Sequence, residues 1–384
     1  MKRREFIKTT GQVIATSMFF SGDLRLAGSD QGTVSDRRPD PSAFDQPIMK
    51  AISWGMNAPN PHNSQAWKFK LLNDMEALFF VDETRLLHDT DPPSRQIHIG
   101  CGCFLETLRL GASTLGYTTE LDLFPEGIYP LEYTGTKPVA LIRIVSEATE
   151  PLSLSSEILT RQTHRAEYEG PMISDTEFKE LIETATPEFS TTHLENDPNR
   201  LSDLIELLYR GMDIEAHSHG PYDESRLWFR VGQKDIETKR DGINFRTNGS
   251  KGLGLFFLEM IVDTENETAW HKETPINSFL KGYKAQLNTA KGVVYWKTET
   301  NTQLDWVNCG IDYVRFQLAA EKAGLVLHPL NQVIQEYPEM DDLRSQFNQF
   351  VEVQEPAKVQ MIVRIGRGDR LYYSYRRDPQ DLLT

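Results

Sequence analysis

Two arginines and a threonine stand at a spacing that suits anion binding. Arg161, Thr163 and Arg165 lie in the segment 157–165, which reads EILTRQTHR. On a helix or at a helix end, arginines four residues apart can reach the same anion, and a guanidinium group binds phosphate oxygens in pairs. The segment therefore indicates a phosphate site; the alternative is two solvated arginines that balance nearby glutamates.

A loop with two prolines is the second candidate. Residues 58–67 read APNPHNSQAW and lie between a helical run and a strand-like run. The prolines fix the backbone, and the side chains of Asn60, Asn63 and Gln65 can hold the edge of a flat polar ligand. His62 either lines that ligand or braces the loop.

Two later segments carry weaker signals. A turn that follows Gly324 is fixed by Pro329 and offers free backbone N–H groups. The basic pair Arg376-Arg377 follows a strand that we expect over residues 372–375. Neither segment defines a site alone.

The sequence contains no strong metal or dinucleotide motif. His217 and His219 lie near Asp213 and Glu215, but their alternation fits no strong ligand pattern and favours a solvated helix end. The three cysteines cannot form a disulfide framework, and we expect them to pack as small apolar side chains. From the histidine and cysteine patterns we expect no metal ion. No Gly-x-Gly-x-x-Gly motif follows a strand, so we also expect no Rossmann site.

The composition bounds the class of protein. A chain of 384 residues with 39% hydrophobic residues can bury a large core, so we expect a globular protein. Its formal net charge of −15 repels nucleic acid and anionic lipid, and neither is an expected partner. In this acidic background, clustered arginines indicate a local anionic ligand.

The N-terminus resembles a twin-arginine export signal. It reads MKRREFIK, and the apolar stretch that follows over residues 13–20 is too short to span a bilayer. This predicts export by the twin-arginine machinery to the periplasm or another extracytoplasmic location, with no stable membrane span. The alternative is a basic start of a cytoplasmic protein. We assign residues 1–35 to the signal and a linker.

Hydrophobic periodicity predicts the elements around these groups. We expect helices over 44–56 and 97–115, and strands over 67–72, 77–81 and 138–145.

The helix over 97–115 has a counterpart later in the chain. At a constant offset of 208, the matching pairs are Cys101 with Cys309, Gly102 with Gly310, Leu110 with Leu318, Ala112 with Ala320 and Gly116 with Gly324. Chance likeness between two amphipathic helices is the alternative. A duplicated α+β unit explains the pattern better, with halves near 36–150 and 151–384.

The order of these segments resembles the nitroreductase family, and in particular its Acg-like subgroup, in which two nitroreductase-type units are fused in one chain. The resemblance covers most of residues 44–380. It implies an α+β, nitroreductase-like fold whose tandem units form an intramolecular pseudo-dimer, so that a monomer suffices for one site. It also implies FMN as the cofactor.

The resemblance assigns residues to the FMN site motif by motif. The phosphate and ribityl motif matches Arg161, Gln162, Thr163 and Arg165; the loop from the other unit matches Asn60, Pro61 and Asn63, with His62 beside them; the turn near flavin N5 matches Pro329, Asn331 and Gln332; the C-terminal basic pair matches Arg376 and Arg377. Two positions depart from the family pattern, because Ala66 replaces a proline and Asn331-Gln332 replaces a Glu-Gly pair.

The activity that the resemblance implies is that of an FMN-dependent oxidoreductase. Hydride would pass from NAD(P)H through FMN to a nitro, quinone or similar small-molecule acceptor in a ping-pong cycle. Since the flavin supplies the redox chemistry, no catalytic acid or base is nominated. The alternative function is a non-catalytic protein that binds or sequesters flavin in a covered site.

Overall fold

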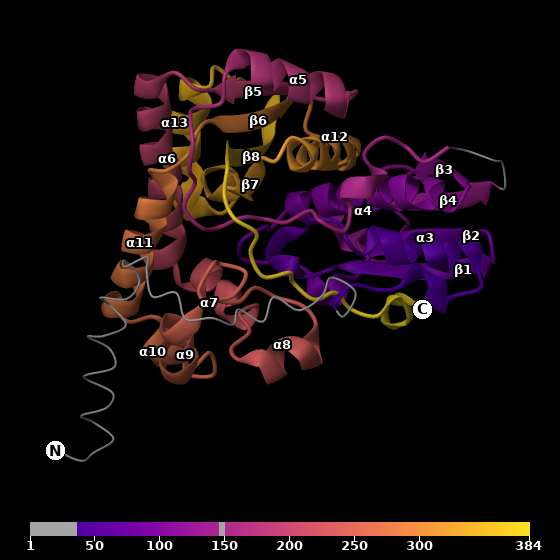
Figure 1. The fold of residues 1–384 in the computed structure, drawn as a ribbon, viewed down its shortest axis with the longest axis horizontal. Helices are drawn as coiled ribbons and strands as arrows, with labels where there is room; N and C mark the ends of the chain where they lie inside the picture. Colours follow the sequence, from indigo (N-terminus) through magenta and orange to yellow (C-terminus); the bar gives the residue numbers. More distant parts are fainter. Residues whose placement is uncertain (1–36, 146–149) are drawn as a thin grey trace.

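Two four-stranded antiparallel sheets form the framework of the molecule (Figure 1). The computed structural model describes residues 37–145 and 150–384, so the predicted export signal lies outside the described residues. The α+β class and the two tandem units expected from the sequence are confirmed, because each sheet is built from one part of the chain. None of the described helices has both the length and the apolar content needed to cross a membrane.

The first sheet is built from residues 67–145. In chain order its helices and strands are α3 (Pro47–Gly55), β1 (Trp67–Asn73), β2 (Glu76–Val81), α4 (Arg95–Ser113), β3 (Thr118–Leu123) and β4 (Ala140–Val145). The strands lie in the order β1-β2-β4-β3. The predicted helices and strands are present, with ends that differ by a few residues.

The second sheet repeats this plan with residues 191–366. Its helices and strands are α5 (Asp175–Ala185), β5 (Thr191–Glu195), β6 (Val293–Thr298), α12 (Gln303–Lys322), β7 (Val326–Pro329) and β8 (Lys358–Gly366). The order β5-β6-β8-β7 matches that of the first sheet strand for strand. The pairing register also matches, since Glu120 pairs with Arg143 as His328 pairs with Arg364.

One long insertion distinguishes the second half. Where β1 and β2 are joined by a tight turn, β5 and β6 are separated by the helices α6 (Pro198–His217), α7 (His219–Leu227), α8 (Gln233–Lys239), α9 (Gly252–Ile261), α10 (Glu267–Trp270) and α11 (Glu273–Leu287). Helices α6, α7 and α11, together with α13 (Asp341–Phe350), bury a second apolar core against β6 and β8. The polar stretch over 233–249 contains α8 and irregular turns.

The repeated helices α4 and α12 pack directly against each other, as Figure 1 shows at the centre of the molecule. A Cβ atom on Gly102 would lie 1.9 Å from the carbonyl oxygen of Val307, and one on Gly310 would lie 2.0 Å from that of Ile99. At the offset of 208, Gly310 corresponds to Gly102 and Val307 corresponds to Ile99. The same contact is therefore made twice, once in each direction, as expected for two units related by a two-fold axis. Glycine is therefore required where the helices cross, and Cys101, Cys103 and Cys309 are buried beside it as free thiols.

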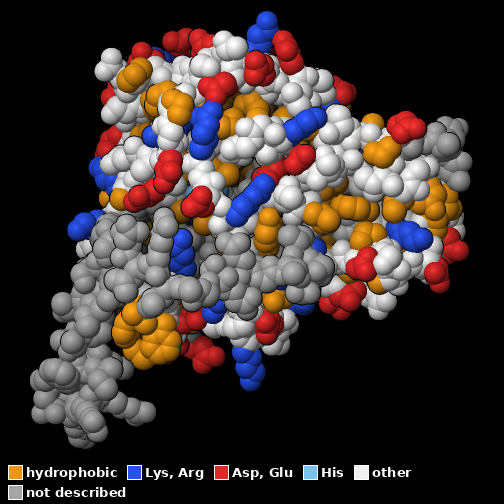
Figure 2. Space-filling view, viewed as in Figure 1, with side chains coloured by type: hydrophobic (Ala, Val, Ile, Leu, Met, Phe, Trp, Pro, Cys, Tyr) orange, Lys and Arg blue, Asp and Glu red, His pale blue; other side chains and the backbone are white. Residues whose placement is uncertain are grey.

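The C-terminal segment returns from the second half to the first. After β8 it runs past α3, and the N–H of Thr384 donates to the carbonyl of Phe69 on β1 at 2.9 Å. The strand expected over 372–375 is absent, because these residues pair with no sheet and adopt irregular backbone. Figure 2 shows acidic and basic side chains interspersed on one face of the molecule.

Gly102→Ala is expected to destabilise the protein. The added methyl group meets a backbone carbonyl that cannot move without shifting α12, and such overpacking costs about 1–3 kcal/mol. Gly254→Ala in α9 is the matched control, since nothing lies within 4 Å of its new Cβ and alanine favours a helix. Urea unfolding measures both variants. A Gly102→Ala protein as stable as the Gly254→Ala control would contradict the helix contact.

Candidate anion-binding site

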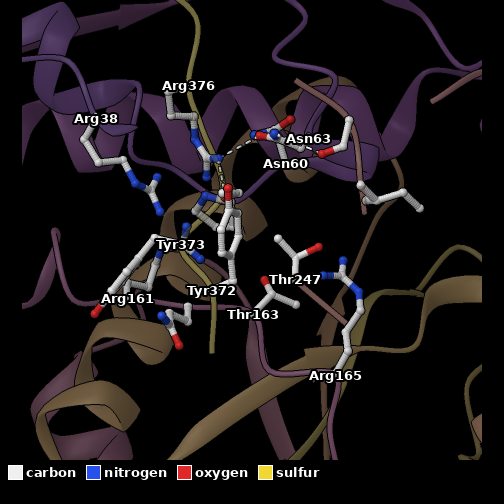
Figure 3. Close-up of a pocket in the computed structure, with 15 residues that line it drawn as sticks. Arg38, Asn60, Asn63, Arg161, Thr163, Arg165, Thr247, Tyr372, Tyr373 and Arg376 are labelled. Atoms are coloured by element: carbon white, nitrogen blue, oxygen red, sulfur yellow. Dashed lines mark hydrogen bonds between the residues drawn. The ribbon is translucent and has the colours of Figure 1, made fainter. Parts of the chain in front are cut away.

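A pocket with a cavity volume of about 50 Å³ lies where segments of both halves meet (Figure 3). Its walls come from five separate stretches of chain. The lining residues are Arg38, Pro59, Asn60, Asn63, Arg161, Gln162, Thr163, Arg165, Gly242, Ile243, Thr247, Tyr372, Tyr373, Ser374 and Arg376. The structure therefore brings the predicted arginine motif, part of the proline loop and one of the two C-terminal arginines into one place.

Four arginines converge on this pocket. Arg38, Arg161, Arg165 and Arg376 reach it from different sides in Figure 3, and none of the lining residues that the structure describes is acidic. Nε and Nη1 of Arg38 and Nε of Arg161 are buried without a hydrogen-bond partner. Buried donors without partners are costly, so the pocket suits a ligand with several acceptor oxygens.

Burial and mutual repulsion destabilise these cations. Burial lowers the pKa of Arg38 to about 9, with a further contribution from Arg161. Burial also lowers the pKa of Arg165 to about 10, and that of Arg376 falls well below its ordinary value for the same reason and because of Arg38 and Arg161. Arginine keeps its proton in proteins, so the shifts express a cost that a bound anion would relieve.

The end of α3 fixes two of the arginines. Nη2 of Arg161 donates to the carbonyl of Asn57 at 3.0 Å, and Nε of Arg376 donates to the carbonyl of Met56 at 2.7 Å. Carbonyl groups at a helix C-terminus carry partial negative charge and attract cations. Arg165 differs, because no hydrogen bond or ion pair to it is found among the described residues, and its guanidinium remains available to a ligand.

The arginine motif is extended, which corrects the prediction of a helix or helix end. The N–H of His164 donates to the carbonyl of Leu327 at 2.9 Å, so the segment lies beside β7 like a short strand. Alternate residues of an extended segment point to the same side, which lets Arg161, Thr163 and Arg165 all line the pocket. The side chain of Gln162 is also bonded to the backbone of Leu371 at 2.7 Å and 2.9 Å, which braces the C-terminal segment.

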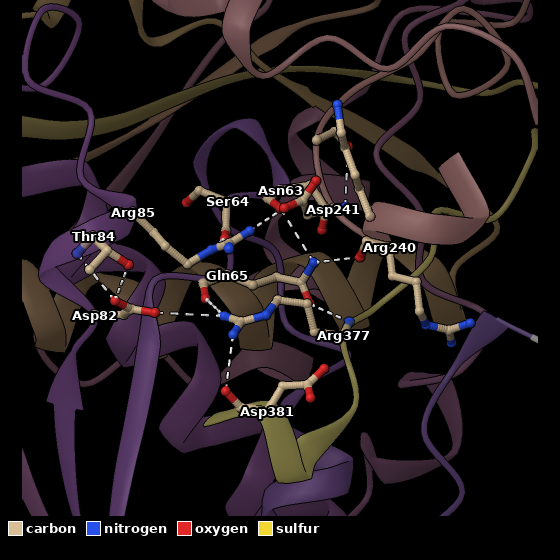
Figure 4. Close-up of polar contacts among 12 residues, drawn as sticks. Asn63, Ser64, Gln65, Asp82, Thr84, Arg85, Arg240, Asp241, Arg377 and Asp381 are labelled. Atoms are coloured by element: carbon tan, nitrogen blue, oxygen red, sulfur yellow. Dashed lines mark hydrogen bonds and ion pairs between the residues drawn. The ribbon is translucent and has the colours of Figure 1, made fainter. Parts of the chain in front are cut away.

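The proline loop has an unusual backbone that its neighbours hold in place (Figure 4). His62, Asn63 and Gln65 have φ values of 51°, 53° and 51°, a left-handed conformation that side chains rarely adopt. Nε2 of Gln65 donates to the carbonyl of Arg240 at 2.9 Å, and the N–H of Arg377 donates to Oε1 of Gln65 at 2.8 Å. The loop is therefore shaped by contacts with the insertion and with the C-terminal segment.

Six predicted site residues do not line the pocket: Pro61, His62, Pro329, Asn331, Gln332 and Arg377. Arg377 lies on the outer side of the loop and donates to the carbonyl of Asp381 at 3.1 Å. Oδ1 of Asn331 accepts from the N–H of Ile362 at 2.9 Å, which fixes the turn to β8. Arg377 and Asn331 thus contact other parts of the chain, and the place of all six residues in an FMN site stays a prediction.

Some lining residues were not predicted. Arg38 lies three residues after the segment assigned to the signal and a linker, and with Arg37 it forms a basic pair that the sequence analysis did not single out. Thr247 and the adjacent Gly242 and Ile243 come from the insertion, where the sequence has no recognisable motif. Only the folded chain brings these segments to the arginines.

A buried polar chain lies next to the pocket. Nε2 of His62 is 3.1 Å from Oγ of Ser225, which in turn is 3.5 Å from Oε1 of Glu215. Glu215 is 5% exposed, and its Oε2 and the Oε1 atom of Gln332 are buried without a partner. Burial raises the pKa of Glu215 to about 7, and burial together with Arg165 lowers the pKa of His62 to about 4. Near neutral pH the Glu215 carboxyl is therefore partly protonated, and the His62 imidazole is neutral.

Sequence comparison relates the chain to nitroreductase-type proteins. It is 29% identical over 151 residues to "Putative NAD(P)H nitroreductase acg" of Mycobacterium tuberculosis, which is 38% of this chain and 44% of that protein. The chain thus spans less than half the length of this relative. It is 22% identical over 327 residues to the uncharacterized protein Rv3127 of the same organism, which is 83% of this chain and 86% of that protein. The similarity supports a relationship with the nitroreductase family.

Solved structures show a weaker likeness. A nitroreductase with bound FMN from Bacteroides fragilis matches with a TM-score of 0.34 and 15% identity, over 59% of this chain and 95% of that one. A nitroreductase-like protein from Bacillus cereus matches with a TM-score of 0.35 and 11% identity, over 61% and 95%. Scores this low carry no argument about function. No protein-family profile matches the chain.

Glu215→Gln is expected to change how stability depends on pH. The pKa of this carboxyl is about 7 in the folded protein against 4.5 ordinarily, so the folded state holds more protons between these values. The contribution of Glu215 to the free energy of unfolding is therefore fully present below pH 4.5 and is lost as the pH rises to 7. At 1.36 kcal/mol per pH unit, the loss is about 3 kcal/mol.

Urea unfolding at pH 5 and pH 8 tests this expectation. The Glu215→Gln variant should gain stability relative to the wild type as the pH rises. Glu206→Gln, at an exposed position of the same helix, serves as the control and should follow the wild type. If the wild type and Glu215→Gln lost the same stability between pH 5 and pH 8, the raised pKa of Glu215 would be contradicted.

Proposed function

We propose that the chain binds FMN, with the phosphate group in the arginine pocket. The observation that carries this proposal is the group of three buried arginines and the half-buried Arg165, with unpartnered donors on Arg38 and Arg161 and no carboxylate in the described lining. A phosphate dianion supplies the oxygens and the charge that this group requires. The similarity to "Putative NAD(P)H nitroreductase acg" agrees with it.

Both halves of the chain contribute to the proposed site. Asn60 and Asn63 come from the first half, and Arg161, Thr163 and Arg165 from the second. The reciprocal contact between α4 and α12 holds the halves in this relation. We infer an internal pseudo-dimer with one site per chain, so that a monomer is sufficient.

The proposed activity is that of an NAD(P)H-dependent oxidoreductase. FMN, when bound, accepts a hydride from NAD(P)H and passes it to a nitro, quinone or similar acceptor. Arg161, Arg165 and Arg38 would hold the phosphate, and their field favours negative charge nearby. Reduction of such an acceptor also consumes protons. The partly protonated Glu215 carboxyl, which is linked through Ser225 to His62 at the edge of the loop, is a candidate proton reservoir for that reduction.

A second candidate function is sequestration of flavin without turnover. The insertion covers the pocket, since Gly242, Ile243 and Thr247 form part of its wall. Nδ2 of Asn63 donates to the carbonyl of Gly242 at 3.2 Å, which ties this cover to the loop. A cover fixed in this way would keep a nicotinamide from reaching the flavin.

We further propose that the protein acts outside the cytoplasm after twin-arginine export. The proposal rests on the MKRREFIK start of the sequence. The twin-arginine route carries folded proteins, which is compatible with a cofactor bound before export.

Purified protein is expected to be yellow and to contain about one FMN per chain. Arg165→Ala should weaken FMN binding at least tenfold, because it removes a charge-assisted pair of hydrogen bonds worth about 1.5–3 kcal/mol. The fold should remain intact, since no described hydrogen bond or ion pair involves Arg165. Fluorescence titration with FMN and circular dichroism measure the two properties.

The control for this variant is Arg210→Ala. Arg210 lies on α6, outside the pocket lining, and donates to Gln346 on the surface at 3.0 Å. It should bind FMN like the wild type. Full FMN affinity in Arg165→Ala would show that the phosphate assignment is wrong.

Steady-state oxidation of NAD(P)H separates the two candidate functions. An oxidoreductase should bleach the flavin absorbance with NADH or NADPH and recover it when a quinone or nitroaromatic compound is added. A sequestering protein should keep its flavin oxidised with both donors while dithionite still reduces it. The second result would reject the oxidoreductase and favour sequestration.

A further inference from the structure

Two short helices of the insertion present matching pairs of metal-binding side chains. His219 and Asp223 lie four residues apart on α7, and Glu267 and His271 lie four residues apart at α10. Residues at this spacing share one face of a helix. The two faces meet, because one ligand atom from each of His219, Glu267 and His271 lies within 4.8 Å of the others.

We propose that His219, Glu267 and His271 form a binding site for a divalent transition-metal ion of the zinc class. Ligand atoms around a tetrahedral zinc lie roughly 3.3 Å apart at bond lengths of about 2.0 Å. Nε2 of His219 and Oε1 of Glu267 are already 3.3 Å apart. The His219 and His271 rings stack with centroids 4.4 Å apart and planes inclined by 4°, so one ring must rotate about its side-chain bonds to turn its nitrogen lone pair toward the ion.

The surroundings of His271 resemble those of a metal ligand. Its Nε2 is 3.2 Å from Oδ1 of Asp223, which Arg226 holds at 2.6 Å and 3.0 Å. The edge of the ring also packs on Tyr222, with centroids 5.5 Å apart. A carboxylate that orients a histidine is the usual support of a zinc site, and Asp223 can serve in that role or as a fourth ligand.

The ligand set selects the class of metal. Two imidazoles and a carboxylate suit zinc and similar ions, whereas calcium and magnesium prefer oxygen ligands alone. His219 and Glu267 are largely exposed, with side-chain exposures of 71% and 53%, so an ion can enter from solvent and keep a water ligand.

Metal binding would fasten the cover of the arginine pocket. Helix α7 also carries Ser225, which contacts His62, and Glu224, which accepts from the N–H of Thr90 at 2.9 Å. An ion between α7 and α10 would join the middle of the insertion to a helix already tied to the first half. We therefore expect the ion to stabilise the insertion.

Zinc titration by calorimetry tests the site in the full-length, untagged chain after removal of metal with a chelator. The wild type should bind one zinc ion, and magnesium or calcium chloride at the same concentration should give no binding. His219→Ala and His271→Ala should each reduce zinc affinity at least tenfold. Asp223→Asn should reduce it about tenfold, as expected for a group that orients a ligand.

His217→Ala is the matched control. His217 lies 3.4 Å from Asp213 and 3.8 Å from Glu273 on the same surface, but it is outside the cluster. The zinc affinity of His217→Ala should equal that of the wild type. Zinc should also raise the melting temperature of His217→Ala but not that of His271→Ala. No zinc binding by the wild type, or equal loss in His217→Ala and His271→Ala, would overturn the proposal.

Discussion

The close crossing of α4 and α12 is the constraint on which the rest of the structure depends. Gly102 and Gly310 let each helix touch a backbone carbonyl of the other, at positions related by the same repeat. Any side chain there would force the halves apart. The crossing therefore sets the position of the first-half loop relative to the second-half arginines, and the pocket exists only because that position is fixed.

Electrostatics gives the pocket its chemical character. The whole chain carries a formal charge of −15, yet four arginines meet in one largely buried pocket. No acidic side chain is among the described lining residues. Two of them are fixed by carbonyls at the end of α3, and Arg165 is held by no described polar contact. This arrangement costs stability without a ligand and gains it with a multivalent anion, which is the behaviour of a phosphate site.

Sequence reasoning predicted the elements and the repeat because both depend on local periodicity and on glycine at a contact. It predicted the arginine motif through residue types, although the backbone is extended and not helical. It did not single out Arg38 and Thr247, because their segments have no motif. Asn331 and Arg377, which it assigned to the site, do not line the pocket and contact the backbone of Ile362 and Asp381. Contacts between distant segments, such as His219 with Glu267, have no sequence signal beyond the spacing of each pair.

The most direct measurement compares the affinities of the wild-type protein for FMN and for riboflavin, which lacks the phosphate. If the arginine pocket holds that phosphate, FMN should bind at least a hundredfold more tightly, since two charge-assisted contacts are each worth about 1.5–3 kcal/mol. The preference should shrink as salt screens the arginines. Equal affinity for FMN and riboflavin would contradict the account.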